Sequence, residues 1–155
     1  MSFIRSIGKG AVAGAAGTTA LNAVTYLDMT VRARPASDTP QQAVDQLASK
    51  TGHPVPGQGE DRENRLQGLG PLTGILTGVG VGVLAGALRP ALRRLPAPAA
   101  AALIGLAAMA LTDGPLASLG LTNPKDWSKV DWISDLVPHL VYGAATYATL
   151  ATTPQ

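Results

Sequence analysis

Apolar stretches without charge alternate with polar stretches along the whole chain. Four windows hold no Asp, Glu, Lys or Arg: residues 10–27, 66–88, 95–112 and 136–155. At about 1.5 Å of rise per residue, each window is long enough as a helix to cross most or all of a hydrocarbon core of roughly 30 Å. The pattern therefore predicts an all-α integral membrane four-helix bundle, a single membrane domain over 1–155, with spans at about 10–31, 69–88, 95–112 and 132–151.

The polar loop 32–68 contains the signals of one further helix. Residues 39–42, Thr-Pro-Gln-Gln, provide an N-cap, a proline in the first helical position and a capping-box glutamine. Val44 and Leu47 share one helix face, and a Gly-His-Pro sequence supplies the end. We expect a short amphipathic helix that lies on the membrane or on the bundle, followed by a charged helical lead, 60–67, into the second span.

Glycine recurs at every fourth position of the second span. The positions are Gly70, Gly74, Gly78, Gly82 and Gly86. In water each would weaken a helix by about 1 kcal/mol, whereas in lipid the missing side chains let another backbone approach closely. A spacing of four drifts by about 40° per step around a helix, so two different neighbours are needed to use the whole stripe. This glycine zipper predicts close packing within one chain, with a homo-oligomeric pore as the alternative.

The other spans carry signals of their own. The third span, 95–112, is short, so we expect it to be tilted little or packed centrally. Ahead of the fourth, Asn123 and Pro124 are typical of a helix start, and Trp127 and Trp132 are typical of a membrane interface. The basic, alanine-rich N-terminal segment has some features of a signal peptide, but its length and polar residues favour a retained first transmembrane helix.

Composition agrees with a membrane location. Only 14% of the 155 residues are charged, against roughly a quarter in an average soluble domain. A soluble helical bundle needs more surface charge than the four windows provide. The net charge of +2 is too mild and too scattered for a nucleic-acid surface, and a chain without cysteine has no disulfide or thiol chemistry. A disordered chain, a coiled coil and a nucleic-acid partner are therefore disfavoured.

The placement of basic residues predicts an orientation. The N-terminal segment and the turn at 89–94 fall on the same side of a four-span bundle, and together they hold five basic residues and no acid. Charges in the long loop on the other side are matched, and long segments count little toward orientation. Both termini are therefore predicted to be cytoplasmic, although Arg32 and Arg34, close to the first span, argue the other way.

Ionisable residues in or beside the spans are the candidates for function, because such groups are expensive in a bilayer. The predicted polar cluster consists of Asp28, Asp113, Asp135, His139, Arg32 and Arg34. Its three acids lie near one membrane face whichever way the chain inserts, and Asp135 and His139 share one helix face. One interpretation is a small polar cavity for a proton or a cation. The other is a set of helix-end residues at headgroup depth that pair with one another.

Motifs for enzymatic chemistry are absent from the sequence. There is no nucleophile elbow, phosphate-binding glycine loop or HExxH. A metal site of Asp135, His139 and a second acid is short of ligands, because the only other histidine, His53, lies in the polar loop. We expect no enzyme activity, no cofactor and no metal. The expected partners are the lipid bilayer and either further copies of the chain or a larger membrane complex.

Two short motifs in the last third stand out: Gly120-Leu-Thr-Asn-Pro124, and Asp135-Leu-Val-Pro-His139. They resemble the GLT-x-P turn and the acid followed four residues later by histidine in the YagU-like family of small bacterial inner-membrane proteins, which is largely uncharacterised. Here the acid is aspartate where glutamate is expected, and a proline precedes the histidine. A weaker likeness covers 13–35. Segments 28–40 and 62–86 also resemble actinobacterial multi-pass membrane proteins of unknown function.

The resemblance implies a multi-pass protein of the bacterial inner membrane, associated with acid tolerance or envelope stress. Together with the glycine zipper, it leads us to expect a structural or accessory membrane protein. The alternative is a proton- or cation-handling channel or transporter that uses the polar cluster.

Overall fold

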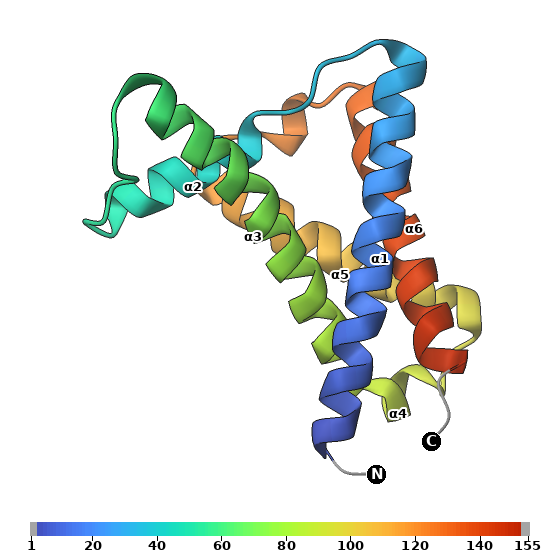
Figure 1. Cartoon of the computed structure of the whole chain (residues 1–155). Coiled ribbons are helices and arrows are strands. Elements are labelled where there is room, and N and C mark those ends of the chain that lie inside the picture. Colours follow the sequence, from blue (N-terminus) through green and yellow to red (C-terminus); the bar gives the residue numbers. More distant parts are fainter. Residues whose placement is uncertain (1–2, 153–155) are drawn as a thin grey trace.

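The computed structural model describes residues 3–152, most of which are helical (Figure 1). This range contains six α-helices, one short 3-10 helix and no strand. The elements are α1 (Phe3–Arg32), α2 (Thr39–Lys50), α3 (Gly59–Ala87), α4 (Arg89–Leu92), α5 (Ala97–Ser118), η1 (Pro124–Asp126) and α6 (Lys129–Thr152). The predicted all-α class is confirmed, and each predicted span falls largely within one of the four long helices.

The polar loop between α1 and α3 contains its helix, α2, at the predicted place. The helix begins one residue earlier than predicted. Asp38 is the N-cap in place of Thr39, so Pro40 is the second helical residue and not the first. The Asp38 carboxylate accepts a 2.8 Å hydrogen bond from the Gln42 side-chain amide, so the glutamine contributes to the start of the helix by another route. The charged segment 60–67 forms the first turns of α3, as predicted.

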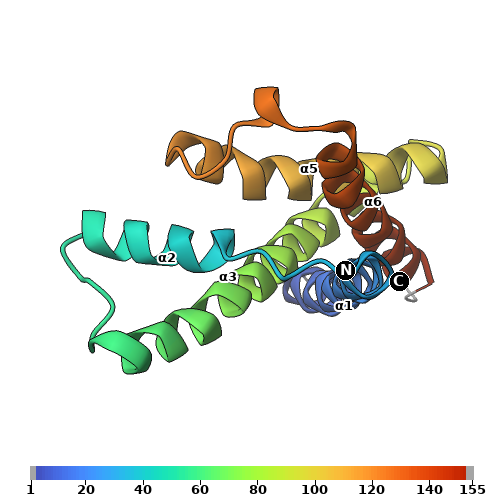
Figure 2. The ribbon, with the colours of Figure 1, turned by 90° about the horizontal axis from the view of Figure 1, so that it is seen from above.

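The four long helices pack in the order α3, α1, α6, α5 (Figures 1 and 2). α1 is central, because it packs against α3 on one side and against α6 on the other, antiparallel to both. α2 folds back on the first half of α3, and α5 packs mainly on α6. The start of α1 and the end of α6 therefore lie at the same end of the molecule, the lower end in Figure 1.

Backbone packs against backbone where α1 meets α3. A side chain at Gly82 would meet the main chain of Gly14, and one at Gly86 would come within 2.7 Å of the carbonyl oxygen of Ser6. A side chain at Gly14 would approach the carbonyl oxygen of Gly78 to 2.6 Å. Glycine is required at these positions because any Cβ would push the two helices apart.

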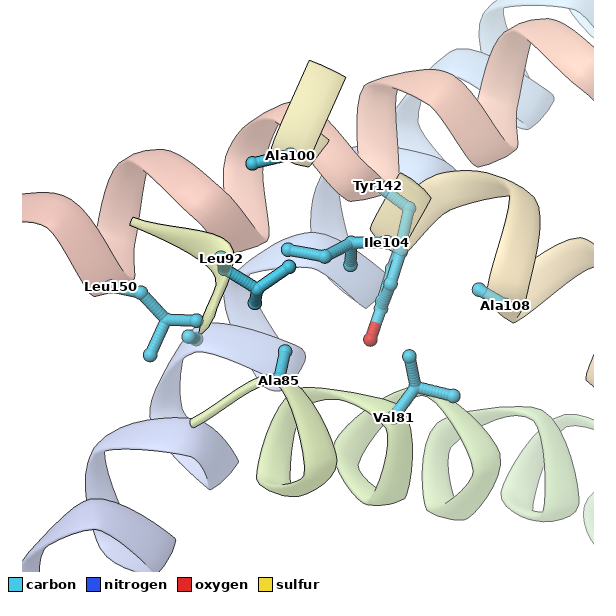
Figure 3. Packing of buried hydrophobic residues seen from close by; sticks show 9 residues of the cluster. Val81, Ala85, Leu92, Ala100, Ile104, Ala108, Tyr142 and Leu150 are labelled. Carbon is cyan, nitrogen blue, oxygen red and sulfur yellow. The ribbon is translucent and has the colours of Figure 1, made fainter. Parts of the chain in front are cut away.

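Small residues occupy most of the buried positions, and many bulky apolar residues are exposed on the surface. Figure 3 shows the buried hydrophobic residues from close by. The buried hydrophobic cluster consists of Ala13, Val81, Ala85, Leu92, Ala100, Ile104, Ala108, Tyr142 and Leu150. Tyr142, the largest fully buried side chain, is 1% exposed. By contrast, Leu76 on α3 and Leu103 on α5 are 62% and 52% exposed. The closest helix contacts thus run through small residues, and many of the large apolar residues of α3 and α5 face outward.

The third predicted span differs from α5 in extent and position. Asp113 was expected to end the span, but α5 continues to Ser118 and places Asp113 inside the helix. Pro115 does not stop it, because the φ of proline is compatible with a helix and its missing N–H removes only one hydrogen bond. α5 lies at the periphery and crosses α6 obliquely, so the expected central packing is not found (Figure 2). The expected small tilt of this span stays a prediction.

Two helices of the described chain, α3 and α5, are long and apolar enough to cross a membrane. In each, only 22% of the apolar 18-residue window is buried, so neither is a core helix of the molecule. α1 and α6 are also long, but neither contains an equally apolar 18-residue window. Asn22 and Asp28 lower the mean hydropathy of α1, and Asp135 and His139 lower that of α6. Length and apolar composition therefore support two of the four predicted spans, 69–88 and 95–112.

Candidate functional site

The six residues of the predicted polar cluster form two groups on two sides of α6. Ser134 and Asp135 are successive residues, so their side chains leave the helix about 100° apart. Ser134 contacts the group on α1, and Asp135 contacts the group on α5. The first turns of α6 therefore lie between the two groups and hold them at one level of the molecule.

The first group, the Asp28 cluster, consists of Asp28, Arg32, Arg34 and Ser134. Arg32 binds the Asp28 carboxylate in a bidentate manner, with Nε and Nη2 at 2.7 and 2.6 Å from its two oxygens. Arg34 Nε donates a second bond to Oδ2, at 2.6 Å. Arg32 Nη2 also donates to Ser134 Oγ, at 2.6 Å. One carboxylate with two guanidinium groups carries a net positive charge and ties the end of α1 to the start of α6.

The second group, the carboxyl–histidine cluster, consists of Asp113, Asp135 and His139. The Asp113 and Asp135 carboxyl groups lie within hydrogen-bonding reach of each other. The Nδ1 atom of His139 lies 2.8 Å from the backbone oxygen of Asp135 and 3.4 Å from its Oδ1 atom. His139 is 8% exposed, so this cluster is the more enclosed of the two.

A close helix crossing brings the carboxyl–histidine cluster together. At Gly105 of α5, a side chain would come within 2.5 Å of the His139 carbonyl oxygen, and at Gly143 of α6 one would come within 2.6 Å of the Gly105 nitrogen. Asp113 lies about two turns after Gly105, and Asp135 lies about two turns before Gly143. The two acids are thus equally far from the crossing, on the same side of it.

The chemistry open to this cluster is the holding of a proton or a small cation. The Oδ2 atoms of Asp113 and Asp135 are both buried and accept no hydrogen bond from the described part of the chain. Two negative carboxylates in contact repel, and one shared proton or one cation removes that repulsion. Among residues 3–152, no group of three His, Asp or Glu side chains is arranged to hold a metal ion.

The predicted glycine stripe divides between two neighbours and open space. Gly78, Gly82 and Gly86 face α1, whereas Gly70 faces α2, where Gln41 lies 3.1 Å from the position of a Cβ. At Gly74 nothing lies within 4 Å of that position. The drift of a four-residue spacing around the helix explains why one neighbour does not cover the whole stripe.

Several residues with structural roles were missed in the sequence. On α1, Gly10 and Gly14 have the same four-residue spacing as the stripe on α3, and this repeat was the available signal. Gly105 and Gly143 are single glycines in apolar helices and give no such signal. Ser128 starts α6: its Oγ donates to the Asp131 carboxylate at 2.7 Å and accepts from the Asp131 N–H at 3.2 Å.

The predicted interfacial tryptophans lie together beside the start of α6. The ring centroids of Trp127 and Trp132 are 4.9 Å apart, edge to face. The indole N–H of Trp127 donates a 2.8 Å hydrogen bond to the hydroxyl of Thr122. Asn123 caps η1 by accepting from the Lys125 N–H, so the helix start expected at Asn123 and Pro124 is a single 3-10 turn, and α6 begins five residues later.

Comparison with protein-family models, with curated proteins and with solved structures finds no match for this chain. The resemblance to the YagU-like family accordingly stays a prediction.

Proposed function

We propose that this protein is an integral protein of the bacterial inner membrane with a structural or accessory role. The observation that carries the proposal is the exposure of the most apolar helices. α3 and α5 turn large apolar side chains outward, and only 22% of each apolar window is buried. In water such faces would be uncovered apolar surface, whereas hydrocarbon chains cover them at no cost.

The order of packing supports the same proposal. The two less apolar helices, α1 and α6, are the inner pair of the order α3, α1, α6, α5. Some of their polar side chains bind one another, as Arg32 and Ser134 do across the α1–α6 contact. A membrane protein needs this arrangement, because polar groups that face lipid are expensive. Four passes of alternating direction would place both termini on one side, the cytoplasmic side by the distribution of basic residues.

The way in which the helices are joined supports a structural or accessory role. Contacts through glycine backbone, as at Gly14 and Gly82, give a fixed, close-packed unit. Reaction motifs are absent from the sequence, so we propose no enzymatic step. Assistance to a larger membrane complex or to the tolerance of acid or envelope stress is compatible with such a unit.

Extraction from isolated membranes tests the proposal. The protein should stay in the membrane fraction in alkaline carbonate and in 1 M salt, and it should be released by detergent. Release by carbonate without detergent would contradict a membrane-spanning protein. Protease protection of tags at either terminus, in spheroplasts, then tests the cytoplasmic orientation.

The carboxyl–histidine cluster favours a second candidate function, the handling of protons or cations. Its two buried carboxyl oxygens and its enclosed histidine are unusual for residues that only cap helices. Liposomes with the purified protein should then show a pH-dependent flux that His139→Ala removes. His53→Ala is the matched control, because His53 is exposed in the loop after α2. Flux no greater than that of empty liposomes would contradict this candidate.

A further inference from the structure

The start of α1, the α4 turn and the end of α6 lie at the lower end of the molecule in Figure 1. The segments 3–27, 78–104 and 136–152, which run to that end, hold no acidic residue. They contain five cations: Arg5, Lys9, Arg89, Arg93 and Arg94. All ten acids of the chain, with the remaining seven cations, lie in the other segments. The molecule thus has one purely cationic end, which we call the basic end.

The glycine contact between α1 and α3 concentrates this charge. Gly86 allows the end of α3 to touch the Ser6 carbonyl oxygen, so the two cations on either side of Ser6 lie close to Arg89, three residues after Gly86. The pKa of Lys9, which lies outside the predicted span, reflects this proximity. Partial burial, and then the charges of Arg89 and Arg5, hold the pKa of Lys9 below its ordinary value.

Apolar surface adjoins the cations. A small hollow at this end is lined by Arg89, Leu92, Arg93, Tyr147, Leu150 and Ala151. Leu88 and Leu95, which flank the basic turn, are 59% and 40% exposed. Guanidinium groups beside exposed leucines match a ligand that has an anionic head and apolar chains.

We propose that the basic end binds the headgroups of anionic phospholipids, with the α4 turn as the main contact. The inference rests on the proposed membrane location and adds a lipid preference to it. Arginine suits this role because its planar guanidinium binds phosphate oxygens in a bidentate manner. Juxtamembrane cations also gain from the negative surface of an anionic leaflet. Charge complementarity selects an anionic lipid over a zwitterionic one, because five cations with no acid need a net negative partner.

A matched pair of double variants tests the proposal. Arg93→Gln/Arg94→Gln removes two exposed cations from the basic end, and Lys125→Gln/Lys129→Gln removes two exposed cations near the start of α6. Both proteins, purified in neutral detergent, are titrated with dioctanoyl-phosphatidylglycerol while the unfolding temperature is followed. We expect the half-saturating lipid concentration to rise roughly 30-fold for the arginine pair and less than threefold for the lysine pair. Dioctanoyl-phosphatidylcholine should have little effect on any of the three proteins.

Equal losses in the two double variants, or equal stabilisation by both lipids, would overturn the proposal. Stabilisation by inorganic phosphate at the same concentration would also overturn it, because the ligand would then be a free phosphate and not a lipid headgroup. If the arginine double variant does not fold, the salt dependence of lipid binding by the unmodified chain tests the proposal instead. Raising salt from 0.1 to 1 M shortens the screening length from about 10 to about 3 Å, so it should abolish the effect of phosphatidylglycerol.

The lipid titration and the carbonate extraction separate failure of this inference from failure of the proposed function. A protein that resists carbonate extraction but shows no preference for phosphatidylglycerol keeps its membrane location and loses only this inference. A protein that carbonate releases loses both.

Discussion

The hydroxyl of Tyr142 donates a 2.6 Å hydrogen bond to the backbone carbonyl oxygen of Gly78. The bond joins α6 to α3, two helices that otherwise barely touch, because α1 lies between them. The ring itself is buried next to Gly17 of α1, where a side chain would lie 2.8 Å from its carbons. One side chain thus links three helices.

Tyr142→Phe should lower the free energy of unfolding by about 1 kcal/mol, because it removes this buried hydrogen bond and keeps the ring. Thermal unfolding in detergent measures the change. Tyr26→Phe is the control, since Tyr26 is 60% exposed. Equal stability of the two variants would show that the bond contributes nothing.

Gly82→Leu and Gly74→Leu should have opposite effects. A leucine at position 82 would collide with the main chain of Gly14, which no change of rotamer relieves, and should cost about 3 kcal/mol or more. A leucine at position 74 meets nothing within 4 Å and gains up to about 1 kcal/mol in helix propensity. Unfolding temperature and size-exclusion profile in detergent measure both effects.

The same pair separates packing within the chain from packing between chains. If Gly74→Leu were the variant that changed the oligomeric state, the open part of the stripe would be a contact between copies. The homo-oligomer would then be favoured over close packing in one chain.

Arg32 and Ser134 should be energetically coupled. A double-mutant cycle with Arg32→Gln and Ser134→Ala should give a coupling free energy of about 1 kcal/mol, because the guanidinium bonds the hydroxyl directly. The matched cycle of Arg34→Gln with Ser134→Ala should give a coupling near zero, since Arg34 bonds Asp28 and Pro35 instead. Equal coupling in the two cycles would contradict the link between α1 and α6.

Acid should weaken the start of α6. Hydrogen bonds from the hydroxyl and the backbone N–H of Ser128, and then the charge of Arg32, hold the pKa of Asp131 below its ordinary value, against a small opposing effect of burial. The pKa is lower in the folded chain than in the unfolded chain. The carboxylate therefore stabilises the fold above its unfolded pKa, near 4, and this contribution is lost as the pH falls through the folded pKa.

Unfolding temperatures between pH 7 and pH 3 check this prediction. The difference between the unmodified chain and Asp131→Asn should shrink as the pH falls. Glu63→Gln, at an exposed position of α3, is the charge-matched control. A difference that is independent of pH would mean that Asp131 acts only through its size.

The long helices and their loop were predictable because their signals are local. Charge-free windows mark α3 and α5, and the proline near the start of α2 marks that helix whether Thr39 or Asp38 is its cap. The continuation of α5 past Pro115 was not predictable from local rules, since proline stops some helices and is tolerated in others. Apolarity likewise did not predict that the less apolar α1 would be central.

The site was harder to predict because it depends on which helix faces which. Sequence spacing placed Asp135 and His139 on one face, and the structure places them together. The division of the cluster between α1 and α5 depends on the packing order, which single glycines such as Gly105 and Gly143 determine. Nothing in a sequence distinguishes such glycines from those that face open space, as Gly74 does.

The packing order also constrains how the chain is made. α1 leaves the ribosome first, yet its neighbours α3 and α6 begin 56 and 126 residues after it does. Until α3 is made, the glycine face around Gly14 has no partner helix to contact. The first helix is thus among the last to be fully surrounded. The contact between α1 and α3 can form as soon as both helices are synthesised, whereas the contact between α1 and α6 has to wait until α6 is made.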